Sequence, residues 1–165
     1  MNEFRFETER CCLGDRIFSS GAYYWEVELI HGEEWAVGVA SPEVQRKGAA
    51  YLFSPQEKVW CVCRFVETFK ALDNTEFNLD VTADIFKRVG VYLNLTKQTV
   101  SFYEPTTWKQ LYTFTDVPQI VQPFFCLGTR GAEIRLAKRF SERTESKDNF
   151  EEMAEQAGLL ENASL

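Results

Sequence analysis

The stretch from Phe18 to Ala40, FSSGAYYWEVELIHGEEWAVGVA, constrains the fold of this 165-residue chain more than any other segment. An apolar residue occupies every second position from Trp25 to Leu29, with a glutamate between each pair, which predicts a β-strand with one apolar and one charged face. A short polar turn containing Gly32 separates it from WAVGVA at 35–40, which is apolar enough for a strand buried on both faces. We therefore predict one β-hairpin whose two tryptophans anchor a single sheet.

Apolar segments of strand length continue along the chain, and turn residues separate them. No convincing helical periodicity occurs before residue 140. Short strands at regular intervals with turn signals between them are typical of antiparallel sheets. The sequence therefore predicts an all-β fold, an antiparallel β-sandwich of two sheets. The further predicted strands are residues 51–53, 58–65, 77–81, 89–95, 99–103, 111–114, 120–128 and 132–136.

Residues 138–165 differ from the rest, because charged residues are dense there and aromatic residues nearly vanish. Asp148 or Asn149 is a suitable N-cap for a helix, and Gly158 limits its length. Three states stay open for this acidic tail: a frayed helix, disorder, or docking against the sandwich. The apolar residues that recur there at helical spacing are Phe150, Met153, Ala154, Ala157 and Leu160.

Charge and hydropathy exclude two classes of partner. The formal net charge is −7 and the sequence pI is near 4.9, so the field of the whole molecule repels nucleic acid and anionic membranes. No apolar run approaches the ~20 residues that a membrane span needs, and no signal peptide is recognisable. We therefore expect a cytoplasmic chain with no nucleic-acid partner and no direct membrane insertion, and its oligomeric state stays open.

Cysteine usage points to the same compartment. The five cysteines are an odd number and lack the regular spacing of a disulfide framework. We therefore expect reduced thiols, as in cytosolic proteins. The cysteines are Cys11, Cys12, Cys61, Cys63 and Cys126.

Nothing in the sequence predicts catalysis. A nucleophilic triad needs a base, and the single histidine, His31, lies in a polar turn beside Gly32 and two glutamates. The sequence also has no phosphate-binding glycine loop, no dinucleotide fingerprint and no metal-ligand motif. We therefore expect no enzymatic activity, no cofactor and no metal site.

Several blocks of the sequence resemble the SPRY domain, which is found in tripartite-motif ubiquitin ligases, butyrophilins and a group of snake-venom proteins. The blocks occur in the order of that family and extend over most of the chain. The resemblance implies a non-catalytic β-sandwich that recognises a partner through its loops. The matching blocks are FSSG at 18–21, YWEVE at 24–28, WAVGV at 35–39, RKG at 46–48, VGVYL at 89–93, VSFY at 100–103, LYTF at 111–114 and PFFCLG at 123–128.

The same resemblance divides the chain into three parts. Residues 1–20 correspond to the end of the PRY segment that precedes SPRY, and residues 21–137 correspond to the SPRY domain itself. The remaining residues, 138–165, lie beyond the family domain. The leucine-aspartate-proline signature of the PRY segment is absent, so we expect a chain that is truncated or naturally SPRY-only.

Binding on a rigid sandwich is expected at aromatic and arginine anchors in exposed loops. In similar SPRY domains three loop groups form one shallow face that grips a protein or peptide. Phe65 matches a position where relatives often carry an exposed tryptophan, and Cys63 replaces another such tryptophan. The resulting candidate partner-binding residues are Arg46, Lys47, Tyr51, Cys63, Arg64, Phe65, Phe69 and Trp108.

Three functional hypotheses stay open. The preferred one is the target-binding part of a tripartite-motif-type ubiquitin ligase, in which a RING domain outside this sequence transfers ubiquitin. The second is a butyrophilin-like intracellular domain that binds a small phosphorylated ligand through Arg46, Lys47, Arg64 and Lys70. The third is a secreted venom-like SPRY protein, which is expected to carry glycans or an intermolecular disulfide.

Overall fold

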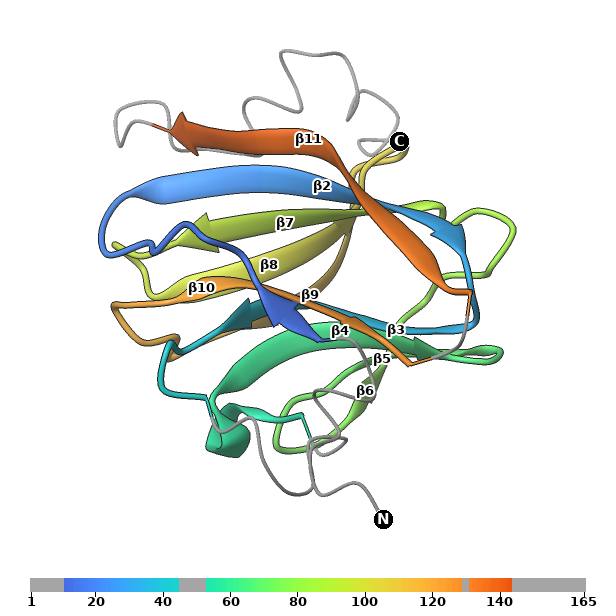
Figure 1. The fold of residues 1–165 in the computed structure, drawn as a ribbon, viewed down its shortest axis with the longest axis horizontal. Coiled ribbons are helices and arrows are strands. Elements are labelled where there is room, and N and C mark those ends of the chain that lie inside the picture. The colour runs from blue at the N-terminus through green and yellow to red at the C-terminus, as the bar shows by residue number, and fades with distance from the viewer. Residues whose placement is uncertain (1–10, 45–52, 129–130, 144–165) are drawn as a thin grey trace, which may run out of the picture.

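The structure is a computed structural model that describes residues 11–44, 53–128 and 131–143, with residues 138–143 described by their backbone alone. These residues form two antiparallel sheets packed face to face (Figure 1). The strands are β1 (Cys12–Leu13), β2 (Ala22–His31), β3 (Glu34–Ala40), β4 (Val59–Phe65), β5 (Thr68–Ala71), β6 (Phe77–Asn78), β7 (Arg88–Asn94), β8 (Thr99–Glu104), β9 (Lys109–Phe114), β10 (Gln122–Leu127) and β11 (Glu133–Arg143).

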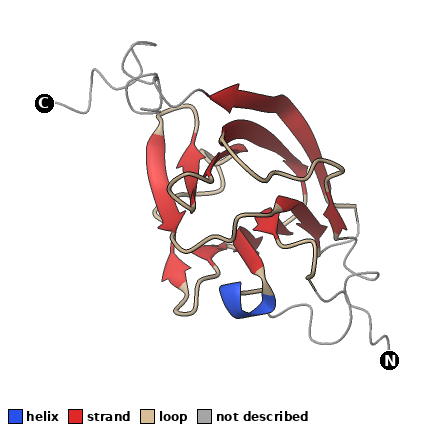
Figure 2. Cartoon of the chain, turned by 90° about the vertical axis from the view of Figure 1, so that its left-hand side faces the viewer, coloured by secondary structure: helices blue, strands red, loops and turns tan. Residues whose placement is uncertain are grey.

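The strand orders define a β-sandwich. One sheet has six strands in the order β1-β10-β3-β4-β5-β6, and the other has five in the order β11-β2-β7-β8-β9. The helical part of the described ranges is one short turn, η1 (Pro55–Glu57), drawn in blue in Figure 2. No helix in these ranges is long and apolar enough to cross a membrane. The predicted all-β sandwich of two sheets is confirmed.

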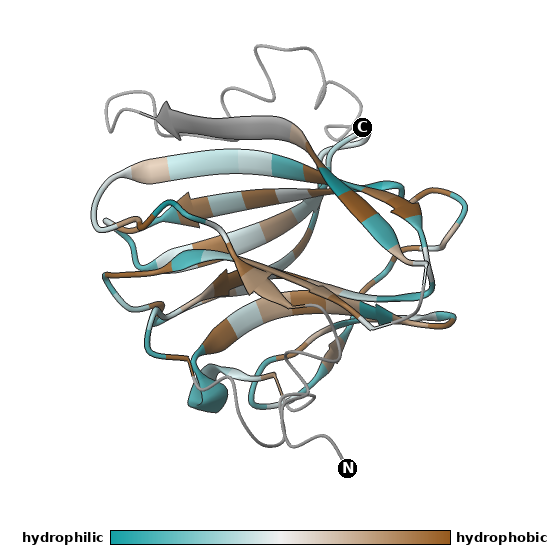
Figure 3. Cartoon of the chain, in the orientation of Figure 1, coloured by the Kyte–Doolittle hydropathy of each residue, from teal (hydrophilic) through white to brown (hydrophobic). Residues whose placement is uncertain are grey.

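Each sheet turns one apolar face inward, and the main core lies between the two sheets. Because side chains alternate along a strand, Trp25 and Val27 of β2 point into this core while Tyr24 and Glu26 point outward. The same alternation appears in Figure 3 as brown, hydrophobic bands that alternate with white or teal bands along the strands. Trp35 also lies in the core, at 3% exposed.

Strands β2 and β3 do not pair with each other, so the prediction of a single hairpin is wrong. β2 pairs with β7 and β11, whereas β3 pairs with β4 and β10. The chain crosses between the sheets at Gly32, and Trp25 and Trp35 therefore belong to opposite sheets. Apolar alternation identifies the inward face of a strand but not its neighbour, and both arrangements bury the same side chains. Gly32 has φ 106°, and a Cβ atom there would lie only 2.5 Å from the Cβ of Ala132.

The C-terminal part of the sandwich is longer than the sequence predicted. The last strand was expected over 132–136, but β11 runs to Arg143 and pairs with β2 along its length. Residues 138–143 therefore continue the sheet and do not begin the tail. The Cα partner of Arg143 is Ala22, at the start of β2.

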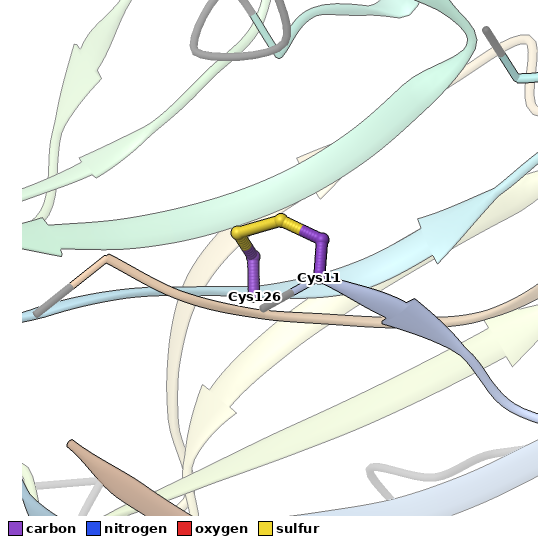
Figure 4. Close-up of a disulfide and its surroundings, with 2 residues drawn as sticks. All are labelled: Cys11 and Cys126. Carbon is purple, nitrogen blue, oxygen red and sulfur yellow. A yellow bond between two sulfur atoms is a disulfide. The ribbon is translucent and has the colours of Figure 1, made fainter. Parts of the chain in front are cut away.

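Two cysteines form a disulfide, so the prediction that all five thiols are reduced is wrong. Cys11 and Cys126 are joined across the edge of the six-stranded sheet, where β1 pairs with β10 (Figure 4). The pairing places them opposite each other, although their spacing in the sequence gives no sign of it. Cys12, Cys61 and Cys63 are free thiols.

Removing the disulfide is expected to destabilise the sandwich. The bond joins residues 115 positions apart, and closing a long loop restricts the unfolded chain, so Cys11→Ser/Cys126→Ser should lower the free energy of unfolding by about 2–4 kcal/mol. Urea unfolding of the oxidised wild type and the double variant measures this difference. Cys12→Ser is the matched control, because Cys12 is exposed and free. Equal stability of all three proteins would contradict the prediction.

Candidate functional site

Metal ligands do not cluster in the part of the chain that the structure describes. His31 is exposed at the end of β2, beside the turn that crosses between the sheets. Across residues 11–44, 53–128 and 131–143, no cluster of three His, Cys, Asp or Glu side chains has the arrangement to hold a metal ion.

The end of β4 brings three of the predicted residues together. Successive side chains point to opposite faces of a strand, so Cys63 and Phe65 lie on the outer face of the six-stranded sheet and Arg64 faces inward. Phe65 is 63% exposed, the largest value for any big apolar side chain in the described ranges. It precedes the turn between β4 and β5, at the right-hand end of the sandwich in Figure 1.

A hollow of about 210 Å³ adjoins Phe65 on this outer face. Its lining is mostly apolar, and we call it the Phe65 hollow. Phe53 and Leu72 also line it, although no sequence pattern selects them as contact residues. Phe53 is held in place by its ring contact with Phe124, with 5.0 Å between the centroids. The other lining residues are Glu34, Trp35, Ala36, Cys63, Arg64, Cys126 and Gly128.

Arg64 packs over the end of the core, and neighbouring residues engage its guanidinium group. Its guanidinium carbon lies 5.3 Å from the centroid of the Phe69 ring, and its Nε donates to the carbonyl oxygen of Val66 at 2.8 Å. Lys70 is on the opposite face of the sheet, where its Nζ pairs with Glu76 at 2.8 Å. The two cations therefore do not converge on one anion.

Phe69 was predicted to be an exposed contact residue, but the structure places it in the core. It lies in β5 and is 4% exposed. Its ring packs between those of Trp35 and Phe86, with centroid distances of 6.2 Å and 5.6 Å. β5 begins directly after the β4–β5 turn. Side chains alternate between the two faces of a strand, and this alternation points Phe69 inward.

Trp108 lies on the other side of the molecule from Phe65. It ends the turn between β8 and β9 with φ 58° and folds over the outer face of the five-stranded sheet. There its ring lies 5.7 Å from that of Tyr24 and 6.4 Å from that of Tyr103. The resemblance implied that Trp108 and Phe65 share one face. The structure instead places them on the outer faces of different sheets.

The turn that carries Trp108 is held by a buried carboxylate. Glu104 is 2% exposed and accepts hydrogen bonds from the backbone N–H groups of Thr106 and Thr107 at 3.0 Å and 2.8 Å, and from the Thr107 hydroxyl at 2.6 Å. Desolvation by burial raises the pKa of Glu104, but these hydrogen bonds outweigh it and leave the pKa below its ordinary value. Ionised Glu104 thus stabilises the turn.

The stability of the chain should depend on the ionisation of Glu104. Because its pKa is lowered in the folded state, its contribution is complete above the ordinary value of 4.5 and is lost as the pH falls through the lower folded value. Glu104→Gln should therefore unfold more easily at pH 7, by about 1–3 kcal/mol, because glutamine carries no charge and has an NH₂ donor in place of one of the two acceptor oxygens. Urea unfolding at a series of pH values from 7 downward measures how the free energy of unfolding of the wild type and of Glu104→Gln changes with pH. The exposed Glu67→Gln serves as the control, and a Glu104→Gln curve parallel to the wild type would contradict the prediction.

Three predicted contact residues, Arg46, Lys47 and Tyr51, lie outside the described residues. A second concavity, of about 480 Å³, opens between the sheets at the edge formed by β1 and β11. Apolar residues such as Phe125 and Leu136 line it, and none of the predicted contact residues does. Of these two concavities, the Phe65 hollow is the one lined by predicted contact residues.

Comparison with known proteins gives consistent matches over this sandwich. The family model described as SPRY domain matches residues 22–139. Human butyrophilin subfamily 2 member A2 is 38% identical over 81% of this chain and 25% of its own length. The mouse E3 ubiquitin-protein ligase TRIM69 is 38% identical over 74% of this chain and 24% of its own length. The chain therefore spans about a quarter of the length of these relatives.

Solved structures show the same architecture. The PSpry domain of TRIM65 superimposes with a TM-score of 0.66 at 22% identity, over 78% of this chain and 69% of that chain. The structure of stonustoxin gives a TM-score of 0.60 at 26% identity, over 73% of this chain and 20% of that chain. The β-sandwich and its strand connections are thus shared with solved proteins whose sequences have diverged widely.

Proposed function

The chain belongs to the SPRY domain family, and from that premise we propose that it is a non-catalytic recognition module that binds a partner protein or peptide at the Phe65 hollow. The observation that carries the proposal is the 63% exposed ring of Phe65 beside an apolar hollow. An exposed aromatic next to a small concavity is typical of the anchor positions of protein interfaces. When a partner side chain enters the hollow, the Phe65 ring and the apolar lining of the hollow are both removed from water.

The surroundings of Phe65 favour an apolar contact over an anion site. Arg64 is engaged by Val66 and Phe69, and Lys70 is paired with Glu76. Arg64 is the one described cation that lines the hollow, so the described cations do not form the cluster that the butyrophilin-like alternative requires; Arg46 and Lys47 lie outside the described residues. The partner is therefore expected to bind with little dependence on salt.

The relatives suggest where such a module works. One is named an E3 ubiquitin-protein ligase and others are butyrophilins, and this chain covers only part of each. We propose that the domain selects a target in the cytoplasm and that any ubiquitin transfer belongs to another domain.

Replacing Phe65 tests this proposal directly. Phe65→Ala should weaken the complex by at least about 2 kcal/mol, or ~30-fold, because the anchor ring is lost from the interface. Proximity labelling identifies the proteins that depend on Phe65, and titration calorimetry with the recovered partner then measures the affinity. Unfolding curves confirm that the variant is folded.

Ile120→Ala is the matched control for Phe65→Ala. Ile120 is 50% exposed and precedes β10 at the opposite end of the sandwich, so its loss should leave binding unchanged. If both variants retain the same partners with the same affinity, the hollow is not the binding site. If Trp108→Ala alone abolishes binding, the outer face of the five-stranded sheet is the interface instead.

A secreted form of the domain is a second candidate, favoured by the Cys11–Cys126 disulfide. Disulfides persist in oxidising compartments and are rare in the cytosol. The similarity to stonustoxin is compatible with this alternative but concerns the fold of only 20% of that chain.

Alkylation during denaturing lysis separates the two candidates, because unfolding exposes buried thiols such as Cys61 to the reagent while a disulfide stays unmodified. If the cytoplasmic proposal is correct, a chain made in the cytosol should be folded before lysis and should then have all five cysteines alkylated. If the chain folds only when it is directed to the secretory pathway, with the three cysteines Cys12, Cys61 and Cys63 free, the secreted candidate is supported and the cytoplasmic one fails.

A further inference from the structure

Glu34 lies beside the exposed ring of Phe65. It is the first residue of β3, and its Cα partner in the antiparallel pairing of β3 with β4 is Phe65. Directly paired residues of antiparallel strands project their side chains on the same face, with Cβ atoms about 5 Å apart. The two side chains are therefore neighbours on the outer face of the six-stranded sheet, and both residues line the Phe65 hollow.

Gly128 leaves room for the Glu34 carboxylate on the other side of β3. The backbone N–H of Gly128 donates to the carbonyl oxygen of Glu34 at 2.9 Å. A Cβ atom at position 128 would lie 3.0 Å from both the Cβ and the Oε2 atoms of Glu34. The carboxylate thus lies at the border of the hollow, where β3 begins and β10 ends.

The described part of the chain does not pair this carboxylate. Glu34 is half-buried, and its carboxylate forms no hydrogen bond or ion pair with a residue that the structure describes. Arg64 also lines the hollow, but its guanidinium group is engaged by Val66 and Phe69. An acceptor with two available oxygens therefore borders an apolar hollow.

A partner that fills the hollow takes the Glu34 carboxylate out of water. Burial of a charge is costly unless the charge is paired and hydrogen-bonded. A purely apolar partner segment would therefore lose affinity at Glu34 that it gains at Phe65. A segment that places a cationic side chain beside its apolar one gains at both residues.

The charge of the surrounding segments favours the same kind of partner. Residues 31–34 and 66–68 flank Phe65 and hold three glutamates and no lysine or arginine. The backbone N–H of Val66 donates to the carbonyl oxygen of Glu33 at 2.8 Å, which brings these two segments together. Charge complementarity therefore favours a cation over an anion next to the hollow.

We propose that the Phe65 hollow recognises a basic-apolar segment, in which an apolar side chain enters the hollow and a nearby arginine or lysine pairs with the Glu34 carboxylate. This specificity rests on the proposed function, because it names the kind of partner that the same site takes. Phe65 is the anchor, and Glu34 selects the charge beside it. Salt screens a half-buried pair much less than an exposed one, so this contact adds little salt dependence.

Selection of random linear dodecapeptides, displayed on phage, against the full chain tests the proposal. Peptides are kept when they bind the wild type and fail to bind Phe65→Ala. These peptides should be enriched in sequences with an arginine or lysine close to an apolar residue. Glu34→Gln should weaken their binding about 10- to 100-fold, because the cation loses its charged acceptor. Titration calorimetry with the synthetic peptides measures the affinities.

Glu57→Gln is the matched control for Glu34→Gln. It removes the same charge from an exposed residue before β4, at the opposite end of that strand from Phe65, and should leave the affinity unchanged. A charge swap gives a second readout: Glu34→Lys should reject the selected peptides and bind versions in which glutamate replaces the basic residue. Unfolding curves verify that each variant is folded.

The possible failures are distinguishable. If no selected peptide depends on Phe65, the hollow is not the partner site, and its preference for a basic residue is wrong as well. If Phe65-dependent peptides show no excess of arginine and lysine, or bind Glu34→Gln as tightly as the wild type, only the preference is wrong. If Glu57→Gln weakens binding as much as Glu34→Gln, net charge sets the affinity and the contact with Glu34 does not.

Discussion

Aromatic packing between the two sheets fixes the end of the sandwich on which the candidate site depends. Trp35 from β3, Phe69 from β5 and Phe86 from the loop before β7 contact one another with centroid distances of 5.6–6.2 Å. All three are at most 4% exposed. Arg64 stacks on this group from the end of β4, so the direction of its neighbour Phe65 is set by the core.

Much of the fold could be predicted from apolar alternation, but strand partners could not. The inward faces of β2, β7 and β8 follow from their patterns, and the hairpin of β7 and β8 follows from the short turn between them. The turn at Gly32 is equally compatible with a hairpin and with a crossing between sheets, because either one buries Trp25 and Trp35. The choice is made by long-range pairing with β10 and β11, which no local pattern encodes.

The candidate site was predictable only in part, for the same reason. Strand alternation is sufficient to separate Phe65 from Arg64 once the bounds of β4 are known. Phe69 was misplaced because no strand was predicted between residues 65 and 77, whereas β5 begins at Thr68 and carries Phe69 into the core. Phe53 and Leu72 join the hollow through distant segments, and the disulfide forms through the pairing of β1 with β10. These relations exist only in three dimensions.

Each outer face of this sandwich carries a buried apolar cluster, and the two clusters are bordered differently. On the six-stranded sheet, the cluster that contains Cys61 and Phe124 is bordered by the Cys11–Cys126 disulfide and leaves Phe65 exposed. On the five-stranded sheet, the tyrosines are fully covered and the carboxylate of Glu104 fixes the turn that brings Trp108 to them. The clusters on both outer faces are buried, and Phe65 stays exposed beside one of them despite its apolar ring. Because burial of apolar area drives association, this exposed ring is the observation on which the proposed recognition site rests.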